Sequence, residues 1–388
     1  MELIKQIQRV ALYIFFFSIN FEMFEPFSSF TYSVSRFTGI LYFVTLIPEI
    51  KFFVKTDRIG NILLTLWLFF GLLTLMSLLN INDVSKEFFN ISIFQNILLF
   101  WFLVNHARKD YLILEKGMLF FAIGTIVFAI MYLVGYGVEY EEGRLTMFKE
   151  NQNTLGINMC IGIIVLLLLV VQNKVQLGRL RYFFLAFLPI MVIFLFATGS
   201  RKAFLSLIAC YITGLILLKT EKPSRKLIAI VIGLVGLVAI GILLLQSEVL
   251  RDRLINTAQT GDMSERDVIW GKVMPTIIEN PIFGVGNTGY DLYSVITFRG
   301  AMMSPHNVIL EVLSITGIVG LLIYTIFLYQ VFLKGYQTYK SNGLLLPILL
   351  AFPMFSLIVS GQILTSKIGW IIFAYVVGSY AVKTKSIQ

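Results

Sequence analysis

Two adjacent basic residues, Arg201 and Lys202, follow the turn residues Thr198-Gly199-Ser200 at the expected start of an apolar helix. The start of a helix carries a partial positive charge, so cations there are disfavoured unless an anion lies beside them. Free backbone N–H groups, the helix dipole and a planar guanidinium all favour a phosphate group. The pair therefore indicates either an anion-binding site or two side chains that extend to a membrane surface.

A histidine occupies a similar position further along the chain. Ser304 can cap a helix and Pro305 fits its first position, which puts His306 in the first helical turn. The helix dipole favours a neutral imidazole there, and a neutral imidazole can accept a proton or hold a ligand by a hydrogen bond. Asn307 and Glu311 follow on the same helix. The alternative is an ordinary capped helix start with an interfacial histidine.

Polar residues also gather at two other places. One is the stretch from Arg144 to Asn153, which precedes an apolar run. The other is the polar segment 247–305, which contains Arg251, Arg253, Arg266 and Arg299. Single loop arginines are usually solvated, whereas four in one loop favour a surface that attracts anions.

The composition indicates that these residues are positioned by the helices of an integral membrane protein. Hydrophobic residues make up 57% of the 388 positions and charged residues 14%, against about a quarter charged in soluble domains. Many apolar runs reach the roughly 20 residues with which a helix crosses a bilayer. We expect an all-α polytopic integral membrane protein with one larger extracytoplasmic loop and about 12 transmembrane helices, at 8–24, 37–54, 59–79, 88–105, 112–135, 154–171, 182–197, 202–218, 227–246, 306–333, 343–361 and 366–382.

The loop charges indicate the orientation. Most Lys and Arg residues fall in alternate short loops, as the positive-inside rule requires, so the net charge of +9 reflects topology and not nucleic-acid binding. Both termini are then cytoplasmic, and the helices that start near 154, 202 and 306 begin on the outer side. His106 falls on the cytoplasmic side, so the two histidines cannot share a metal site. Cys160 and Cys210 lie in apolar runs and indicate neither a disulfide nor a metal site.

The predicted organisation has three parts. Helices one to nine occupy 1–246, an extracytoplasmic loop occupies 247–305, and helices ten to twelve occupy 306–388. In the loop, Ser264-Glu265-Arg266-Asp267 predicts the capped start of a short amphipathic helix. That helix can lie on the membrane or pack over the ends of other helices.

The apolar stripe of the loop helix consists of Trp270, Met274 and Ile278, and Pro275 should kink it. The glycines of Gly284-Val285-Gly286-Asn287-Thr288-Gly289 are expected to keep the following turn loose. Their GxGxxG spacing is not a dinucleotide fingerprint, because a membrane protein's outer loop offers no βαβ unit.

The order of these motifs resembles the O-antigen ligase and polysaccharide polymerase superfamily. The stretch from Arg144 to Asn153 is also similar to a family segment before the middle helix. The other matching pieces cover about residues 198–320 and are, in chain order, Gly199-Ser200-Arg201, Arg266 with Trp270, Asn280-Pro281-Ile282-Phe283-Gly284-Val285-Gly286, His306-Asn307, Leu310-Glu311 and Gly317-Ile318-Val319-Gly320.

The resemblance implies a membrane glycosyltransferase that uses a sugar chain linked to polyprenyl pyrophosphate. It implies a bacterial cell membrane location with the active site on the extracytoplasmic face. By position, Arg201, Lys202 and Arg266 bind the pyrophosphate, with Arg201 also catalytic, and His306 assists attack by an acceptor hydroxyl. The supporting residues are Asn307, Glu311, Arg144 and Asn153. The scheme requires no metal and no cofactor; its partners are the lipid-linked oligosaccharide, the bilayer and other polysaccharide-assembly membrane proteins.

Three functions remain open at this point. The first is a polymerase that joins repeat units into a surface or capsular polysaccharide, and the second is a ligase that moves a glycan to another acceptor. Both break the same sugar–pyrophosphate bond, so the shared motifs do not separate them. The third is a transporter or flippase. Such a protein is expected to have charged or broken-helix sites near the middle of the bilayer.

Overall fold

The structure, a computed structural model, describes residues 2–24, 33–141, 143–172, 174–218, 251, 255, 266–360 and 363–383. The ninth predicted helix, 227–246, and the capping residues Ser264 and Glu265 lie outside this part of the chain. The chain divides into two compact units. Unit 1 comprises Met1–Phe53, His106–Thr260 and Thr338–Ser356, and unit 2 comprises Val54–Asn105, Gly261–Gln337 and Leu357–Gln388.

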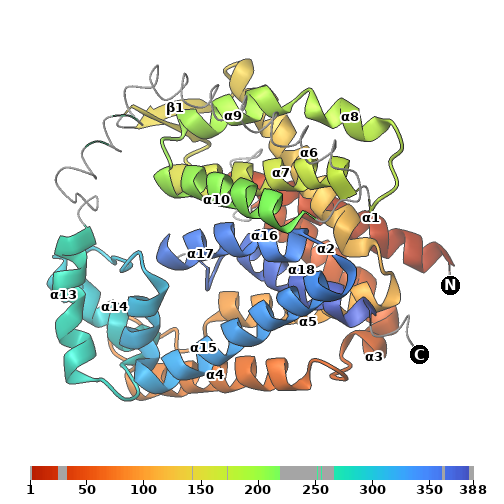
Figure 1. The fold of residues 1–388 in the computed structure, drawn as a ribbon. Helices are drawn as coiled ribbons and strands as arrows, with labels where there is room; N and C mark the ends of the chain where they lie inside the picture. Colours follow the sequence, from red (N-terminus) through yellow and green to blue (C-terminus); the bar gives the residue numbers. More distant parts are fainter. Residues whose placement is uncertain are drawn as a thin grey trace. The chain divides into compact units, whose positions relative to one another are not determined.

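Unit 1 is built around α1, α6 and α7. In this unit α1 packs against α2 and α6, and α7 packs against α6, α9 and α10 (Figure 1). The bounds of its elements are α1 Glu2–Ser18, η1 Ile19–Phe21, α2 Val34–Leu46, η2 Ile47–Glu49, α3 Ile50–Phe53, α6 Ile113–Leu133, β1 Val138–Glu141, β2 Arg144–Met147, α7 Gln152–Gln172, α8 Leu180–Leu185, α9 Leu188–Ala197, α10 Arg201–Leu217 and α16 Leu346–Leu349.

Unit 2 holds the remaining long helices. An aromatic cluster of Phe100, Phe327, Trp370 and Phe373 joins α5, α15 and α18. Phe69 of α4 packs against Tyr324 of α15. The bounds are α4 Gly60–Leu79, α5 Ile91–Lys109, α13 Arg266–Glu279, α14 Gly286–Thr297, α15 Val308–Asn342, α17 Ala351–Ser360 and α18 Lys367–Lys383; α5, α15 and α17 also contribute residues to unit 1.

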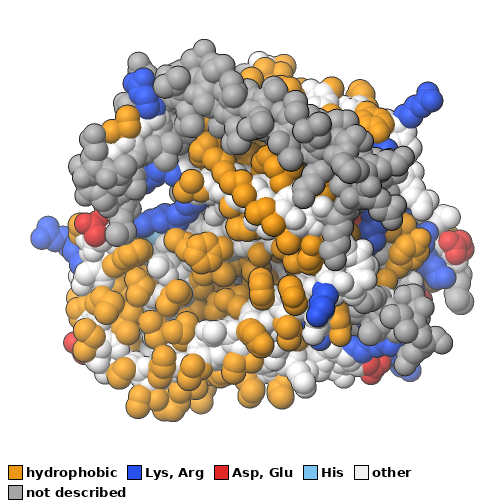
Figure 2. Space-filling model, in the orientation of Figure 1, with side chains coloured by type: hydrophobic (Ala, Val, Ile, Leu, Met, Phe, Trp, Pro, Cys, Tyr) orange, Lys and Arg blue, Asp and Glu red, His pale blue; other side chains and the backbone are white. Residues whose placement is uncertain are grey.

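Five helices of the described chain are long and apolar enough to cross a membrane. They are Gly60–Leu79, Ile113–Leu133, Gln152–Leu169, Leu180–Ala197 and Val308–Asn342, and each coincides with a predicted helix. Figure 2 shows hydrophobic side chains gathered over the face where α4 and α15 lie. Such a surface fits contact with lipid chains. The protein is therefore a helical membrane protein, and the total of twelve crossings stays a prediction.

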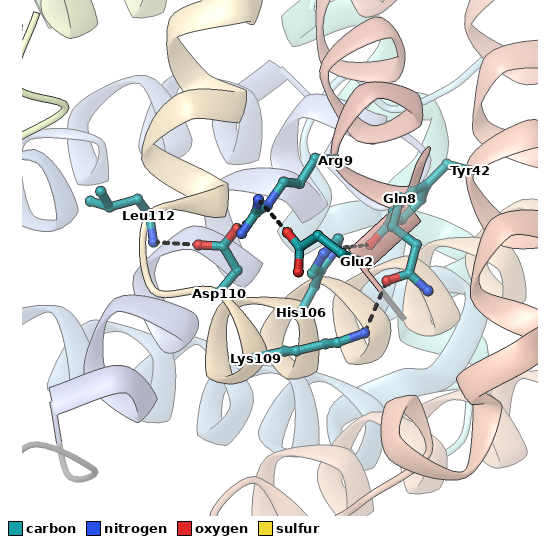
Figure 3. Close-up of polar contacts among 8 residues, drawn as sticks. All are labelled: Glu2, Gln8, Arg9, Tyr42, His106, Lys109, Asp110 and Leu112. Carbon is teal, nitrogen blue, oxygen red and sulfur yellow. Dashed lines mark hydrogen bonds and ion pairs between the residues drawn. The ribbon is translucent and has the colours of Figure 1, made fainter. Parts of the chain in front are cut away.

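A polar cluster closes one end of unit 1 (Figure 3). Arg9 of α1 pairs with Asp110, with 2.7 Å between Nε and Oδ2. Lys109 pairs with Glu49 and also donates to Gln8 Oε1 at 3.0 Å. His106 is buried, and its Nδ1 lies 3.0 Å from Tyr42 Oη. The charged ends of α1, η2 and α5 thus meet, which agrees with the predicted grouping of these loops on one side.

The all-α expectation is wrong in one place. Residues 138–147 form a two-stranded antiparallel hairpin, in which Val138 pairs with Met147 and Glu141 with Arg144. Gly137 and Gly143 have positive φ angles of 68° and 74°, which allow the chain to turn tightly at the ends of β1. All of β2 is buried, whereas most of β1 is exposed. The hairpin therefore carries Arg144 into the interior of unit 1.

The expectation of a loose turn after α13 is also wrong. Residues 280–289, here called the glycine joint, fill a break in α15 at Gly317, whose φ is 61° and ψ is −163°. The N–H groups of Ile318 and Val319 donate to the carbonyls of Pro281 and Ile282 at 2.9 and 3.2 Å. Val285 N–H donates to the Ser314 carbonyl at 2.9 Å. The joint therefore satisfies backbone groups that the helix break would otherwise leave unpaired.

The glycine joint is also attached to α4. Asn287 N–H donates to Ser77 Oγ at 2.8 Å, and Thr288 Oγ1 donates to the Ser77 carbonyl at 2.5 Å. Gly286 begins α14 where a loose turn was expected, and its Cα lies directly against the backbone of Met76 and Ser77. Helices α13 and α14 are therefore fixed to α4 and α15, two spanning helices of the same unit.

Replacing Gly284 or Gly317 with alanine should unfold the glycine joint. A Cβ at Gly284 would lie 2.5 Å from Thr316 N, and one at Gly317 would collide with the Ile282 backbone. Left-handed backbone costs a side-chain-bearing residue about 1–2 kcal/mol, and overpacking adds about 1–3 kcal/mol. We expect a lower thermal midpoint in detergent for both variants.

The control for the joint variants is Gly71→Ala on α4, where an added Cβ meets nothing within 4 Å. This variant should keep the wild-type midpoint, because alanine is the better helix former. Equal midpoints for Gly71→Ala, Gly284→Ala and Gly317→Ala would contradict the role of the joint.

Candidate functional site

In unit 1 the first predicted site residue lies where expected. α10 begins at Arg201, and Ser200 takes an extended N-cap conformation with φ −81° and ψ 94°. Gly199 before it has a φ of 59°, which turns the chain sharply between α9 and α10. The N–H groups of the first turn and the side chains of Arg201 and Lys202 therefore stand together at one helix start.

Arg144 braces this turn from the hairpin. Its side chain is buried, and its Nε donates to the Thr198 carbonyl at 3.1 Å. Its Nη2 donates to Asn153 Oδ1 at 3.3 Å. The Arg144 Cγ and Nε atoms lie 3.3 Å from where a Cβ of residue 199 would stand. The glycine at 199 thus gives the arginine room to lie along the turn.

The start of α7 closes the same region. Asn153, in its first turn, also accepts a hydrogen bond from Ser200 Oγ at 3.3 Å. A Cβ at Gly156 would lie 2.7 Å from Ser200 Cβ, so the two helix starts pack without a side chain between them. Two helix N-termini and the guanidinium of Arg144 therefore converge on the turn that carries Arg201. All three favour negative charge.

Removing the Arg144 side chain should weaken both fold and site. Arg144→Ala removes the Arg144 donor from the buried Thr198 carbonyl and leaves Asn153 Oδ1 with Ser200 Oγ as its donor, which costs about 1–3 kcal/mol. We expect a lower thermal midpoint, with partial recovery in Arg144→Lys, which keeps the charge but lacks the planar fork. Lys149→Ala is the matched control, because Lys149 is exposed beyond the same hairpin. A wild-type midpoint for Arg144→Ala would rule out the bracing role.

In unit 2 the helix that follows His306 starts later than expected. Helix α15 begins at Val308, and Asn307 Oδ1 accepts the N–H of Ile309 at 2.9 Å. Asn307 is therefore the cap, and the expectation that Ser304 caps and Pro305 starts the helix is wrong. His306 precedes the cap with a left-handed φ of 52°, and its N–H donates to Ser304 Oγ at 3.3 Å. Asn accepts such bonds as readily as Ser, so local preference alone does not choose between the two caps.

Helix α13 holds the turn before His306. Trp270 Nε1 donates to the Pro305 carbonyl at 2.9 Å. Arg266 lies four residues before Trp270 on α13, so the two side chains share one face of that helix. The indole thereby ties the helix that carries Arg266 to the segment that carries His306.

Glu311 lies behind this turn, four residues after Asn307. Its N–H donates to the Asn307 carbonyl at 2.9 Å. Its Oε2 atom is buried and has no hydrogen-bond partner among the described residues. Burial and the nearby Glu311 carboxyl raise the pKa of Tyr290, whose hydroxyl donates to the Met303 carbonyl at 2.9 Å. The Oε2 atom therefore has hydrogen-bonding capacity that the described residues do not use.

The structure brings the predicted residues together in two groups. Unit 1 joins Arg144, Asn153 and the α10 start with Arg201 and Lys202, and unit 2 joins the turn at His306 with Asn307, Glu311 and the helix of Arg266. Arg201 and His306 belong to different units, so a common site for them stays a prediction. Thr198 and Tyr290 were not predicted as site residues. The Thr198 carbonyl accepts a hydrogen bond from Arg144, and the Tyr290 hydroxyl donates to the Met303 carbonyl; both contacts form only in the folded chain.

The match to known proteins covers the part of the chain that contains most of these residues. Residues 186–325 match the family model described as O-Antigen ligase. This range contains Arg201, Arg266, the glycine joint, His306 and Glu311, whereas Arg144 and Asn153 precede it. No curated protein matches the chain. The resemblance to the O-antigen ligase and polysaccharide polymerase superfamily is thereby confirmed for residues 186–325.

Proposed function

We propose that this protein is a membrane glycosyltransferase that polymerises polyprenyl-pyrophosphate-linked oligosaccharide repeat units into a surface or capsular polysaccharide. The observation that carries the proposal is the start of α10, where Arg201 follows a turn braced by the buried Arg144. The family match over residues 186–325 supports a glycan-processing enzyme of the O-antigen ligase or polymerase type.

The reaction assigns one task to each group of residues. Arg201, Lys202 and Arg266 hold the diphosphate and stabilise the negative charge that develops as it leaves. A hydroxyl oxygen of the acceptor attacks the anomeric carbon of the donor sugar, and the bond from that carbon to the diphosphate oxygen breaks. The bonding electrons leave with the diphosphate, and the hydroxyl proton passes to the imidazole of His306.

The supporting residues act on the acceptor and on the backbone. Asn307 caps the first turn of α15 and so fixes the His306 backbone, while the Oε2 atom of the Glu311 carboxyl group forms a hydrogen bond with a sugar hydroxyl. Asn153 and Arg144 hold the turn before Arg201. We propose a bacterial cell membrane location, with this chemistry on the extracytoplasmic face and other polysaccharide-assembly membrane proteins as partners.

The helix break at Gly317 bears on the transporter alternative. A transporter would use the freed backbone groups of a broken helix to bind its cargo. Here the N–H groups of Ile318 and Val319 already bond to carbonyls of the glycine joint. The break therefore serves packing within unit 2, which favours an enzyme over a flippase.

The test is to incubate the purified protein with its lipid-linked repeat unit and to separate the products by size. A ladder of growing glycans on the lipid carrier supports the polymerase. Transfer of label to a different acceptor without a ladder indicates the ligase. Movement of intact lipid-linked sugar across vesicles, with no new glycosidic bond, would overturn the enzyme proposal.

A further inference from the structure

Helix α13 exposes an apolar face that its own unit does not cover. Val273 and Ile277 are buried on its inner side together with Thr276. On the outer side Val268 is 55% exposed and Ile278 68% exposed, and Met274 is exposed between them. A helix that is apolar on its outward side as well as its inward side requires a second apolar environment.

This face is continuous with the exposed side of a spanning helix. Ile318 of α15 bonds through its N–H to the Pro281 carbonyl, and Val319 bonds to Ile282. Exposed Ile282 and Phe283 therefore lie directly beside exposed Ile318. From Ile318 the exposed apolar side chains continue down α15 at helical spacing, as Leu322, Ile326, Tyr329 and Phe332.

The spanning helix identifies what covers this surface. The stripe on α15 belongs to a helix long and apolar enough to cross a membrane, so its natural environment is the hydrocarbon of the bilayer. A surface that runs without interruption from that stripe through Ile282 and Phe283 onto α13 meets the same lipid. Exposed charges lie beside this face at Asp267, Lys272 and Glu279, so the contact of Ile282 with α15, and not charge, indicates which end of α13 lies deeper.

We propose that α13 is embedded in the outer leaflet of the bilayer, at a slant, with the Ile278–Phe283 end deeper than the Asp267 end. The occupant of its exposed face is lipid. The slant places the start of α13, with Arg266, at the level of the lipid phosphates. This last consequence rests on the proposed function, since it puts Arg266 at the depth where a membrane-anchored diphosphate donor carries its charge.

The experiment measures depth with single nitroxide labels on the full chain in vesicles of phosphatidylethanolamine and phosphatidylglycerol. Labels are attached to Val268→Cys, Ile278→Cys and Phe283→Cys, while the native Cys160 and Cys210 are buried. Leu322→Cys is the deep reference and exposed Arg299→Cys the aqueous one. Collisions with oxygen report lipid, and collisions with a water-soluble nickel complex report solvent.

We expect the labels at residues 268, 278 and 283 to favour oxygen over nickel, with depth increasing in that order. Nickel access at residue 278 equal to that at residue 299 would overturn the proposal. So would a label at residue 278 that is shielded from both reagents, because a protein surface would then cover the face. If Ile278→Cys does not accumulate, Met274→Cys on the same face takes its place.

The depth profile is independent of the proposed function. A protein that makes no glycan but shows the expected profile contradicts the enzyme and leaves the lipid contact intact. A flat, aqueous profile in a protein that makes glycan contradicts the lipid contact alone.

Discussion

The His306→Ala variant is expected to transfer glycan about 10²–10⁴-fold more slowly than the wild type, while inserting and accumulating normally. That range is typical for the loss of a positioned general base. The imidazole follows a turn held by Trp270 and precedes the cap Asn307, so its backbone is fixed independently of its side chain. The measurement is the initial rate of polymer formation per mole of purified protein.

Two further variants separate the proton-transfer role of His306 from a role in shape. His306→Gln keeps a hydrogen-bonding side chain but cannot accept the proton, so it should be nearly as slow as His306→Ala. Asn307→Ser should keep most of the rate, because serine also caps helices well. Wild-type rates in His306→Ala would remove this residue from the site.

The Arg201→Ala variant is expected to lose about 10²–10³-fold in transfer rate, the usual cost of removing one donor that stabilises developing negative charge. Arg201 begins α10 beside the turn that Arg144 braces, so the remaining helix start still attracts the diphosphate. The loss should therefore fall mainly on kcat. Comparing kcat and KM for the lipid-linked donor measures this.

The matched variants for this position are Arg201→Lys and Arg179→Ala. Lysine keeps the charge without the planar fork, so Arg201→Lys should recover part of the lost rate. Arg179 is exposed at the start of α8, and Arg179→Ala should leave both kinetic constants unchanged. Equal rates for Arg201→Ala and Arg179→Ala would defeat the assignment of Arg201.

The two helix starts differ in how far the sequence determines them. Before α10, Gly199 turns the chain and Ser200 takes the N-cap position, so the helix predicted at 202–218 begins within one residue of its predicted start. Before α15, Ser304 and Asn307 are both good caps, and local preference does not rank them. The folded chain selects Asn307, because Trp270 of α13 holds the Pro305 carbonyl outside the helix.

The break at Gly317 and the hairpin at 138–147 could not be predicted from local pattern. Glycine inside an apolar run is compatible with an unbroken helix. Only the carbonyls of Pro281 and Ile282, more than thirty residues earlier, make the break favourable. The hairpin likewise depends on a packed setting, since β2 is buried within unit 1 and a lone hairpin is marginal in water.

The pairing between the glycine joint and α15 also limits how unit 2 can move. Straightening α15 would remove three backbone hydrogen bonds and would pull Gly284 and Gly317 out of direct contact with the opposing backbone. The segment from Val308 to Thr316 therefore cannot pivot alone. Any displacement of this segment must therefore move His306, α13 and α14 together as one rigid body, which rotates about the backbone around Ile282.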